Sequence, residues 1–164
     1  TDVGEEIRRV LLTPGRTLDA GTELLLMFAS RAQLVNALIK PALARGDYIV
    51  TDRFTDASFA YQGGGRGIEA SDIRALETRF VGIQPDLTLL LDLSVDQGMA
   101  RAQSRGQSLD RIESERHDFF LNVRAAYLCR AAEEPQRIKV IDASQTAESV
   151  VRQVLDALTI WMKA

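Results

Sequence analysis

Short apolar runs alternate along the chain with longer stretches in which apolar residues recur every three or four positions. The short runs are residues 48–50, 87–93 and 138–142, and each is bounded by charged or turn-forming residues. Runs that are mostly apolar are typical of parallel strands buried on both faces. The longer stretches have the spacing of one helix face. This alternation predicts an α/β fold with a parallel sheet and crossover helices.

The helical stretches have recognisable starts and breaks. Helices are predicted over residues 1–12, 23–44, 69–81 and 95–105, around 119–127, and from the third strand to the C-terminus. Thr22 is a candidate N-cap of the second helix, and Pro41 is expected to kink or split it. The glycines at 63–67 are interpreted as a flexible loop. Three strands are few for a doubly wound domain of 164 residues, so the sheet is expected to lack members.

Composition indicates one ordinary globular domain covering residues 1–164. The net charge of −3 and the pI of about 5.2 argue against a nucleic-acid-binding surface. No apolar run approaches the roughly 18 residues of a membrane span, and no signal-peptide pattern opens the chain. One cysteine and one histidine make a zinc site implausible. A cytoplasmic protein is therefore expected.

Polar residues follow the first apolar run, at 48–50. The run ends on Asp52 and Arg53. In open α/β sheets ligands bind beyond the carboxyl ends of the strands, where a carboxylate can meet a metal ion and a guanidinium can grip a phosphate. Ser58, Tyr61 and Gln62 then add hydroxyl, phenol and amide groups. The alternative is a structural Asp–Arg ion pair followed by a plain loop.

A second charged region extends from Arg101 to Arg116. Its arginines lie among acids, which is typical of a solvated helix face, but the Gly106 break also allows a mobile basic loop. No G-x-x-x-x-G-K-[ST] phosphate-binding loop occurs in the chain, and the Gly63–Gly67 cluster does not replace it.

Several motifs, in this order and spacing, are specific together. They are Glu6-Ile7-Arg8, the run from Thr22 to Gln33, Pro41-Ala42-Leu43, Asp52-Arg53-Phe54, the run from Ser58 to Gly67, Pro85-Asp86-Leu87-Thr88 and Leu109-Asp110-Arg111. With them the sequence resembles the bacterial thymidylate kinases, which transfer the γ-phosphate of ATP to dTMP. The resemblance implies a P-loop-kinase-like three-layer α/β fold with a parallel sheet.

The resemblance also implies roles for individual residues. Arg53 should bind the dTMP phosphate with Arg8 nearby, and Asp52 should help to organise Mg²⁺. Arg31 should hydrogen-bond the thymine edge. The remaining substrate residues are Phe28 (or its neighbour Met27) stacking on the ring, Ser58 and Gln62 lining the base, and Tyr61 crowding the sugar 2′ carbon. Phosphoryl transfer needs mainly positioning and positive charge.

Beyond the dTMP site, the resemblance implies a lid at about residues 101–116. Its Arg101, Arg105 and Arg111 should close on ATP and supply positive charge to the transferring phosphoryl. ATP as donor, Mg²⁺ as cofactor and a homodimer are implied in the same way.

The chain departs from the family pattern at its start. In the family a strand, the phosphate-binding loop, its helix and a second strand precede the Glu-x-Ile-Arg helix, so these elements are expected before Thr1. These 164 residues alone are therefore expected to be inactive. One alternative is a non-catalytic relative that binds nucleotide or dimerises. Another is a kinase of a different small molecule, which the base-lining set Arg31, Ser58 and Gln62 disfavours.

Overall fold

The C-terminal half of the chain contains a short parallel sheet of two strands. The computed structural model describes residues 1–104 and 110–163. Strand β1 (Thr88–Asp92) pairs with strand β2 (Ile138–Asp142), so that Thr88 lies opposite Ile138 and Asp92 opposite Asp142. Both strands were predicted, and they agree with the sequence pattern within two residues. The predicted α/β fold with a parallel sheet is confirmed.

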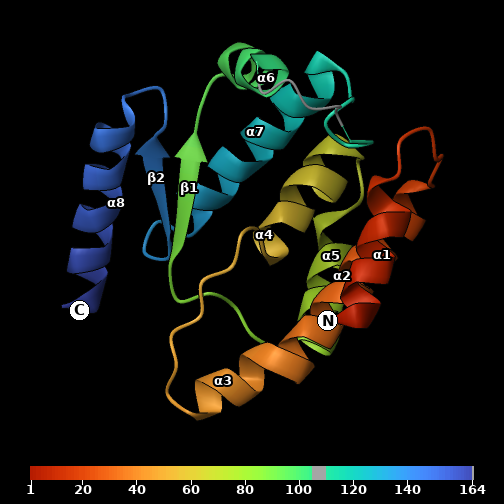
Figure 1. Cartoon of the computed structure of the whole chain (residues 1–164), viewed down its shortest axis with the longest axis horizontal. Coiled ribbons are helices and arrows are strands. Elements are labelled where there is room, and N and C mark those ends of the chain that lie inside the picture. The colour runs from red at the N-terminus through yellow and green to blue at the C-terminus, as the bar shows by residue number, and fades with distance from the viewer. Residues whose placement is uncertain (105–109, 164) are drawn as a thin grey trace.

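Helices lie on both sides of this sheet. Parallel strands need a long crossover, and the chain between β1 and β2 contains α6 (Val95–Ser104) and α7 (His117–Glu133). Helix α7 contacts both strands, whereas α8 (Ala147–Met162) packs against β2. Figure 1 shows the two strands standing between α8 and α7. The crossover therefore brings α7 next to the carboxyl end of β1.

The N-terminal helices form a second group. Helix α1 (Asp2–Leu12) packs on α2 (Ala20–Leu34), which continues through a π-helical segment, η1 (Val35–Ile39), into α3 (Lys40–Ala44). The predicted cap Thr22 is wrong, because Asp19 caps α2 by accepting from Gly21 N at 2.8 Å. The long helix is divided near Pro41, as expected. The π-helical segment η1 ends at Ile39, and Pro41 lies in the first turn of α3.

The main core lies between α2 and the segments after residue 53. Helix α4 (Thr55–Ser58) continues into the π-helical η2 (Phe59–Gly65), and α5 (Ala70–Leu76) continues into η3 (Glu77–Val81). The core side chains are Leu24, Phe28, Val35, Ile39, Phe54, Phe59, Ile73 and Val81. Because Phe54 and Phe59, which flank α4, share this core with α2, the polar residues of α2 and α4 are held in a fixed relation.

The strand predicted at residues 48–50 is not formed. These residues are extended coil, and Val50 is 98% exposed. A strand needs a neighbour that accepts its backbone hydrogen bonds. In the part of the chain that the structure describes, β1 pairs only with β2, and no strand lies along this segment. Tyr48 instead contacts the Trp161 ring of α8, with 6.5 Å between ring centroids.

The loop predicted at the glycine cluster is wrong as well. Gly63 to Gly65 belong to η2, which packs against α7. A Cβ on Gly64 would lie 2.6 Å from the Cβ of Ala126, and one on Gly65 would lie 2.4 Å from a ring carbon of Phe119. The glycines therefore serve close helix packing.

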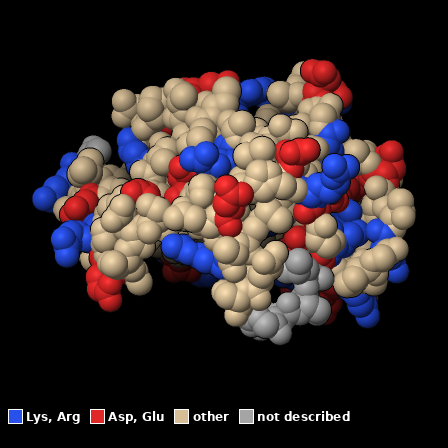
Figure 2. All heavy atoms as spheres, turned by 90° about the horizontal axis from the view of Figure 1, so that it is seen from above, with Lys and Arg blue, Asp and Glu red and all other residues tan. Residues whose placement is uncertain are grey.

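Charged side chains are intermixed over the surface. On the face in Figure 2, acidic and basic groups alternate without a broad basic patch. Within residues 1–104 and 110–163, no helix combines the length and apolarity needed to cross a bilayer.

Candidate functional site

A cavity of about 860 Å³ opens beside the carboxyl end of β1, between α2, α4, η2, α6 and α7. Leu90 to Leu93 line it, so the cavity lies at the edge of the sheet where ligands bind in α/β folds. Many of the residues predicted for substrate binding also line it: Arg8, Arg31, Asp52, Arg53, Ser58, Tyr61 and Gln62. The fold thus brings these residues to one cavity although they are far apart in the sequence.

Arg53 adopts an unusual backbone conformation at this cavity. Its φ angle is 60°, the left-handed region that residues with a Cβ rarely adopt, and its guanidinium carbon lies 4.9 Å from the Tyr61 ring centroid. Such strain costs on the order of 1–3 kcal/mol and concentrates at functional sites. Asp52, beside it, is exposed at the cavity edge and has no ion pair with any described residue.

Arg31 supplies hydrogen-bond donors from α2. Its Nη1 donates to Ser58 Oγ at 3.1 Å, and its guanidinium lies 5.1 Å from the Phe28 ring centroid. Burial lowers the pKa of Arg31 to about 10, with partial compensation from the field of Tyr127 and nearby acids. The guanidinium stays charged at neutral pH, and it can donate but not accept.

The aromatic side chains near Arg31 are placed differently from the prediction. Phe28 lies in the core at 2% exposure, beneath the arginine, and is not among the cavity-lining residues described. Met27 and Phe54 do line the cavity, and the Phe54 ring centroid is 5.8 Å from the Arg31 guanidinium. Sequence reasoning missed Phe54, although its position directly after Asp52-Arg53 was a signal.

Gln62 is held by Glu23, a residue that sequence reasoning did not single out. Glu23 lies in the first turn of α2 at 1% exposure, and its Oε1 accepts from Gln62 Nε2 at 2.8 Å. Its Oε2 accepts from Arg66 Nη2 at 3.2 Å and from Arg111 Nη2 at 2.6 Å. Burial alone raises the pKa of Glu23, but these hydrogen bonds outweigh burial and lower it. The only sequence signal was an acid inside an apolar helical run.

The arginines predicted to form a lid are engaged elsewhere. Arg111 binds Glu23 and also donates from Nε to the Leu11 carbonyl at 2.6 Å. Arg101 is exposed and donates to the Ala143 carbonyl at 3.1 Å. Neither is among the residues that line the cavity. Arg105 lies outside the described residues.

An ion pair that the sequence did not reveal closes one wall of the cavity. Arg124 of α7 binds both carboxylate oxygens of Asp92, the last residue of β1, at 2.7 and 2.8 Å. Both residues line the cavity. The hydrogen bonds that Arg124 donates to the Asp92 carboxylate raise the pKa of Arg124. This bidentate pair fixes α7 to the end of the strand and neutralises the Asp92 carboxylate.

A buried ionic network joins α4 to α7 and to the residue that precedes β2. Asp56 accepts from Arg130 Nε at 2.8 Å and from Arg137 at 2.7 and 2.9 Å. Burial raises the pKa of Asp56, but the hydrogen bonds from Arg137 and Arg130 outweigh it and lower the pKa. Arg130 also stacks on Phe59, 4.0 Å from the ring centroid. The network ties the helix that carries Ser58 to α7 and the start of β2.

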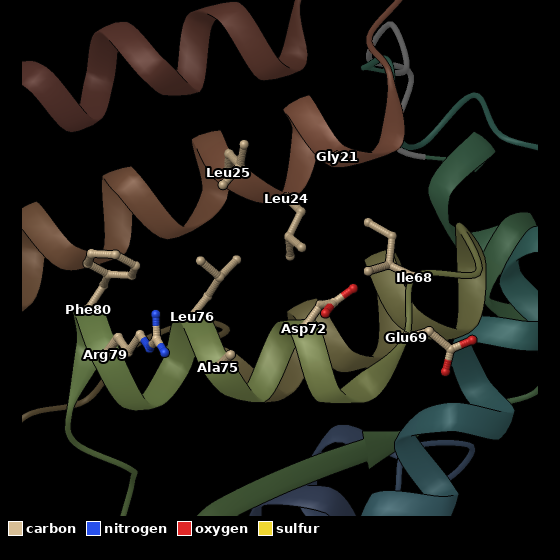
Figure 3. A pocket seen from close by; sticks show the side chains of 10 residues that line it. All are labelled: Gly21, Leu24, Leu25, Ile68, Glu69, Asp72, Ala75, Leu76, Arg79 and Phe80. Atoms are coloured by element: carbon tan, nitrogen blue, oxygen red, sulfur yellow. The ribbon is translucent and has the colours of Figure 1, made fainter.

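A second hollow, of about 580 Å³, lies between α2 and the α5–η3 helix. Figure 3 shows Leu24 of α2 facing Leu76 across it, with Phe80, Asp72 and Arg79 also along the α5–η3 side. None of the predicted site residues lines this hollow. Most of the residues predicted for substrate binding line the larger cavity instead.

Comparisons with known proteins match almost the whole chain. A family model described as thymidylate kinase matches residues 1–154. The thymidylate kinases of Chromohalobacter salexigens and Pseudomonas putida (strain W619) are each 52% identical, over 162 and 160 residues. They align with 97% and 96% of this chain and 76% of their own lengths. The crystal structure of Ehrlichia chaffeensis thymidylate kinase gives a TM-score of 0.77 at 27% identity, covering 96% of this chain and 76% of that one. None of these relatives supports the non-catalytic alternative.

Proposed function

The chain belongs to the thymidylate kinase family, whose enzymes transfer the γ-phosphate of ATP to dTMP, and we propose that the cavity beside β1 is its dTMP site. The observation that carries this proposal is the meeting of Arg31, Arg53 and Asp52 in one cavity at the sheet edge. Two separate cationic donors suit a ligand with both a carbonyl-bearing ring and a phosphate. An uncharged sugar would need neither.

Arg53 is assigned to the phosphate of dTMP, with Arg8 as a second cation on the cavity wall. The planar guanidinium can bind two phosphate oxygens at once. Its contact with the Tyr61 ring limits its freedom before the ligand arrives. Tyr61, held by that contact, is assigned to the sugar 2′ position, where its bulk would exclude a ribose hydroxyl.

Asp52 is assigned to Mg²⁺. Asp92 is committed to Arg124, whereas the Asp52 carboxylate has no partner among the described residues. Mg²⁺ normally keeps several waters and takes one or two carboxylates together with substrate phosphates, so a single exposed aspartate fits it. When bound, the ion would neutralise charge on the nucleotide phosphates.

Arg31, Ser58 and Gln62 are assigned to the thymine edge, with Met27 and Phe54 as the apolar surface near the ring. Phe28 is assigned to support Arg31 from the core. Arg101, Arg105 and Arg111 remain assigned to the transferring phosphoryl. For Arg101 this requires the loss of one exposed hydrogen bond, and for Arg111 the release of a buried carboxylate.

The dTMP assignment is tested by titration calorimetry with dTMP, thymidine and dCMP on one preparation. We expect dTMP to bind most tightly, because thymidine lacks the phosphate that Arg53 grips and dCMP presents the wrong ring edge. Absence of dTMP binding, or equal binding of all three ligands, would place the substrate elsewhere.

We also propose a homodimer that works in the cytoplasm, where its nucleotide substrates are found. Support for self-association comes from large exposed apolar side chains along α2, η1 and α3, of which Leu25 is 59% exposed. Sedimentation velocity checks this proposal: the unchanged chain should sediment as a dimer and Leu25→Glu should shift it toward the monomer. A monomer at all concentrations would exclude it.

A further inference from the structure

Glu23 is a buried carboxylate that the proposed substrate contacts do not use. It joins α2 to Gln62 and Arg66 of the η2 region and to Arg111. Arg66 has a second carboxylate partner, Glu115, at 2.7 Å on its other side. Glu23 is thus the one member of this cluster, among the described residues, that contacts both the arginines and a cavity-lining amide.

The contact with Glu23 decides which way the Gln62 amide points. An amide side chain can turn over and offer either its oxygen or its NH₂ group. An ionised carboxylate only accepts, so it can bind the nitrogen of Gln62 and not the oxygen. Burial favours the neutral form of Glu23, but the hydrogen bonds from Gln62, Arg111 and Arg66 outweigh it, lower the pKa of the carboxyl and keep it ionised. The Gln62 oxygen therefore points away from Glu23, and no described residue donates to it.

We propose that Glu23 is a positioning residue for base selection, which holds the Gln62 carboxamide so that only its acceptor oxygen is offered to the bound base. This inference rests on the proposed dTMP site. It concerns a residue that does not touch the substrate and acts through Gln62.

The chemistry of the two pyrimidine bases makes this orientation selective. Thymine carries a ring N–H between two carbonyl groups, so it needs an acceptor beside the donors of Arg31. Cytosine has an unprotonated ring nitrogen and an amino group at the matching positions. A freely turning glutamine could serve either base, whereas a fixed one leaves cytosine with two acceptors facing each other. Unpaired polar groups in a desolvated site separate close analogues by large factors.

The substitution Glu23→Gln makes a specific reversal testable. Both arginines donate to Oε2 of Glu23, at 3.2 and 2.6 Å. Gln62 donates to Oε1 at 2.8 Å, and Arg66 Nε makes only a longer bond to Oε1, at 3.4 Å. In Glu23→Gln the arginines keep the amide oxygen, so the new NH₂ group faces Gln62. Gln62 must then turn its oxygen toward residue 23 and its own NH₂ toward the cavity. The substitution should therefore change the group that Gln62 presents to the base from a hydrogen-bond acceptor to a donor.

The experiment measures dissociation constants for dTMP and dCMP by titration calorimetry, with displacement of dTMP where dCMP binds weakly. Glu115→Gln is the matched control, because it makes the same chemical change beside the same arginine without touching Gln62. We expect Glu23→Gln to narrow the dTMP-over-dCMP preference by about tenfold or more, by weakening dTMP and strengthening dCMP. The control should change the ratio by less than about twofold.

A double-mutant cycle separates positioning from general damage. In a Gln62→Met background, Glu23→Gln should no longer change the ratio, because the residue through which it acts is gone. If Glu23→Gln weakens both nucleotides equally, or changes the ratio with Met at position 62, Glu23 has only a structural role. If the unchanged chain binds no dTMP, the proposed dTMP site itself is wrong. That result is distinct from a failure of the Glu23 inference, in which the unchanged chain binds dTMP and Glu23→Gln leaves the preference unchanged.

Hydrogen exchange in the unchanged protein tests the same inference without relying on the folding of Glu23→Gln. The side-chain amide protons of Gln62, identified by their loss in Gln62→Met, should exchange slowly with solvent because one is bound to Glu23. Fast exchange with the chemical shifts of a free glutamine would overturn the proposal.

Discussion

The Arg31 guanidinium donates a hydrogen bond to the Ser58 hydroxyl at 3.1 Å and so joins α2 to α4 across 27 positions of sequence. This bond fixes one edge of the guanidinium and leaves its other N–H groups for a ligand. It also occupies an acceptor site on Ser58, whose own proton remains available. The two residues therefore form one donor-rich unit on the cavity wall.

Replacement of Arg31 should remove base recognition. In Arg31→Ala we expect dTMP to bind about 1.5–3 kcal/mol more weakly, the usual contribution of a hydrogen bond to a charged group. The unchanged chain should bind dTMP more tightly than dUMP by about 1–3 kcal/mol, the contribution of one methyl group. The difference in binding free energy between dTMP and dCMP should be larger. Calorimetric titrations with these nucleotides check both statements, and Gln33→Ala on the exposed side of α2 is the control. If dCMP bound as well as dUMP, Arg31 would not contact the base.

Replacement of Arg53 should remove phosphate recognition. Truncation of a charged group paired with a phosphate costs about 2–5 kcal/mol, so Arg53→Ala should weaken dTMP by that amount. Thymidine has no phosphate, and its affinity should be almost unchanged. Arg45→Ala is the control, because Arg45 forms an exposed ion pair with Asp47 away from the cavity. Equal losses for dTMP and thymidine would move Arg53 away from the phosphate.

Sequence patterns correctly predicted the strands that have a neighbouring strand to pair with. β1 was recognisable because Thr88 alone interrupts the four leucines of residues 87–91, and a fifth leucine, Leu93, follows Asp92. Residues 48–50 have the same pattern but form no strand, since strand formation depends on a neighbour and not on composition alone. The glycines of η2 illustrate the same limit, because their packing against α7 cannot be seen locally.

The site divides in a similar way. Asp52 and Arg53 were candidates because a charge pair ends an apolar run, and Gln62 because it lies in the polar segment that follows. Family resemblance added Arg31 and the roles of all four residues. Glu23 and Asp56 were missed. Their arginine partners lie 43, 88, 74 and 81 positions away, so the sequence shows two ordinary acids and no reason for their burial. Buried charges become visible only when the fold brings their partners together.

The Asp56 network should be important for stability at neutral pH. Asp56→Asn leaves Arg130 and Arg137 without a full counter-charge, and breaking a buried pair costs about 3–5 kcal/mol. Urea unfolding at pH 7 measures this loss. The control Asp47→Asn breaks an exposed pair and should cost about 1 kcal/mol or less. Equal stability of the two variants would mean that the network contributes nothing beyond a surface pair.

The same comparison has a defined pH dependence. The pKa of Asp56 in the folded protein is below its ordinary value of 3.8. A group with a lowered folded-state pKa stabilises the fold above its unfolded-state pKa, and this stabilisation is lost as the pH falls through the folded-state value. The difference in unfolding free energy between the unchanged chain and Asp56→Asn should be constant from about pH 5 to 7 and shrink below about pH 4. A constant difference down to pH 2 would contradict the assignment.

Gly64 should be required for packing and not for backbone flexibility. A Cβ at this position would lie 2.6 Å from Ala126 Cβ and 2.8 Å from the Asn122 carbonyl oxygen, which belongs to the backbone of α7 and cannot turn aside. Gly64→Ala should therefore destabilise the fold by about 1–3 kcal/mol, the usual cost of overpacking. Gly98→Ala is the matched control, because its new Cβ meets nothing closer than Leu93 Cδ2 at 4.0 Å. That substitution places alanine inside α6 and should stabilise the fold by about 0.5–1 kcal/mol. Urea unfolding of both variants gives the comparison. If Gly64→Ala were as stable as the unchanged chain, η2 and α7 would be able to separate freely. Since η2 carries Tyr61 and Gln62, Gly64→Ala should also weaken dTMP binding.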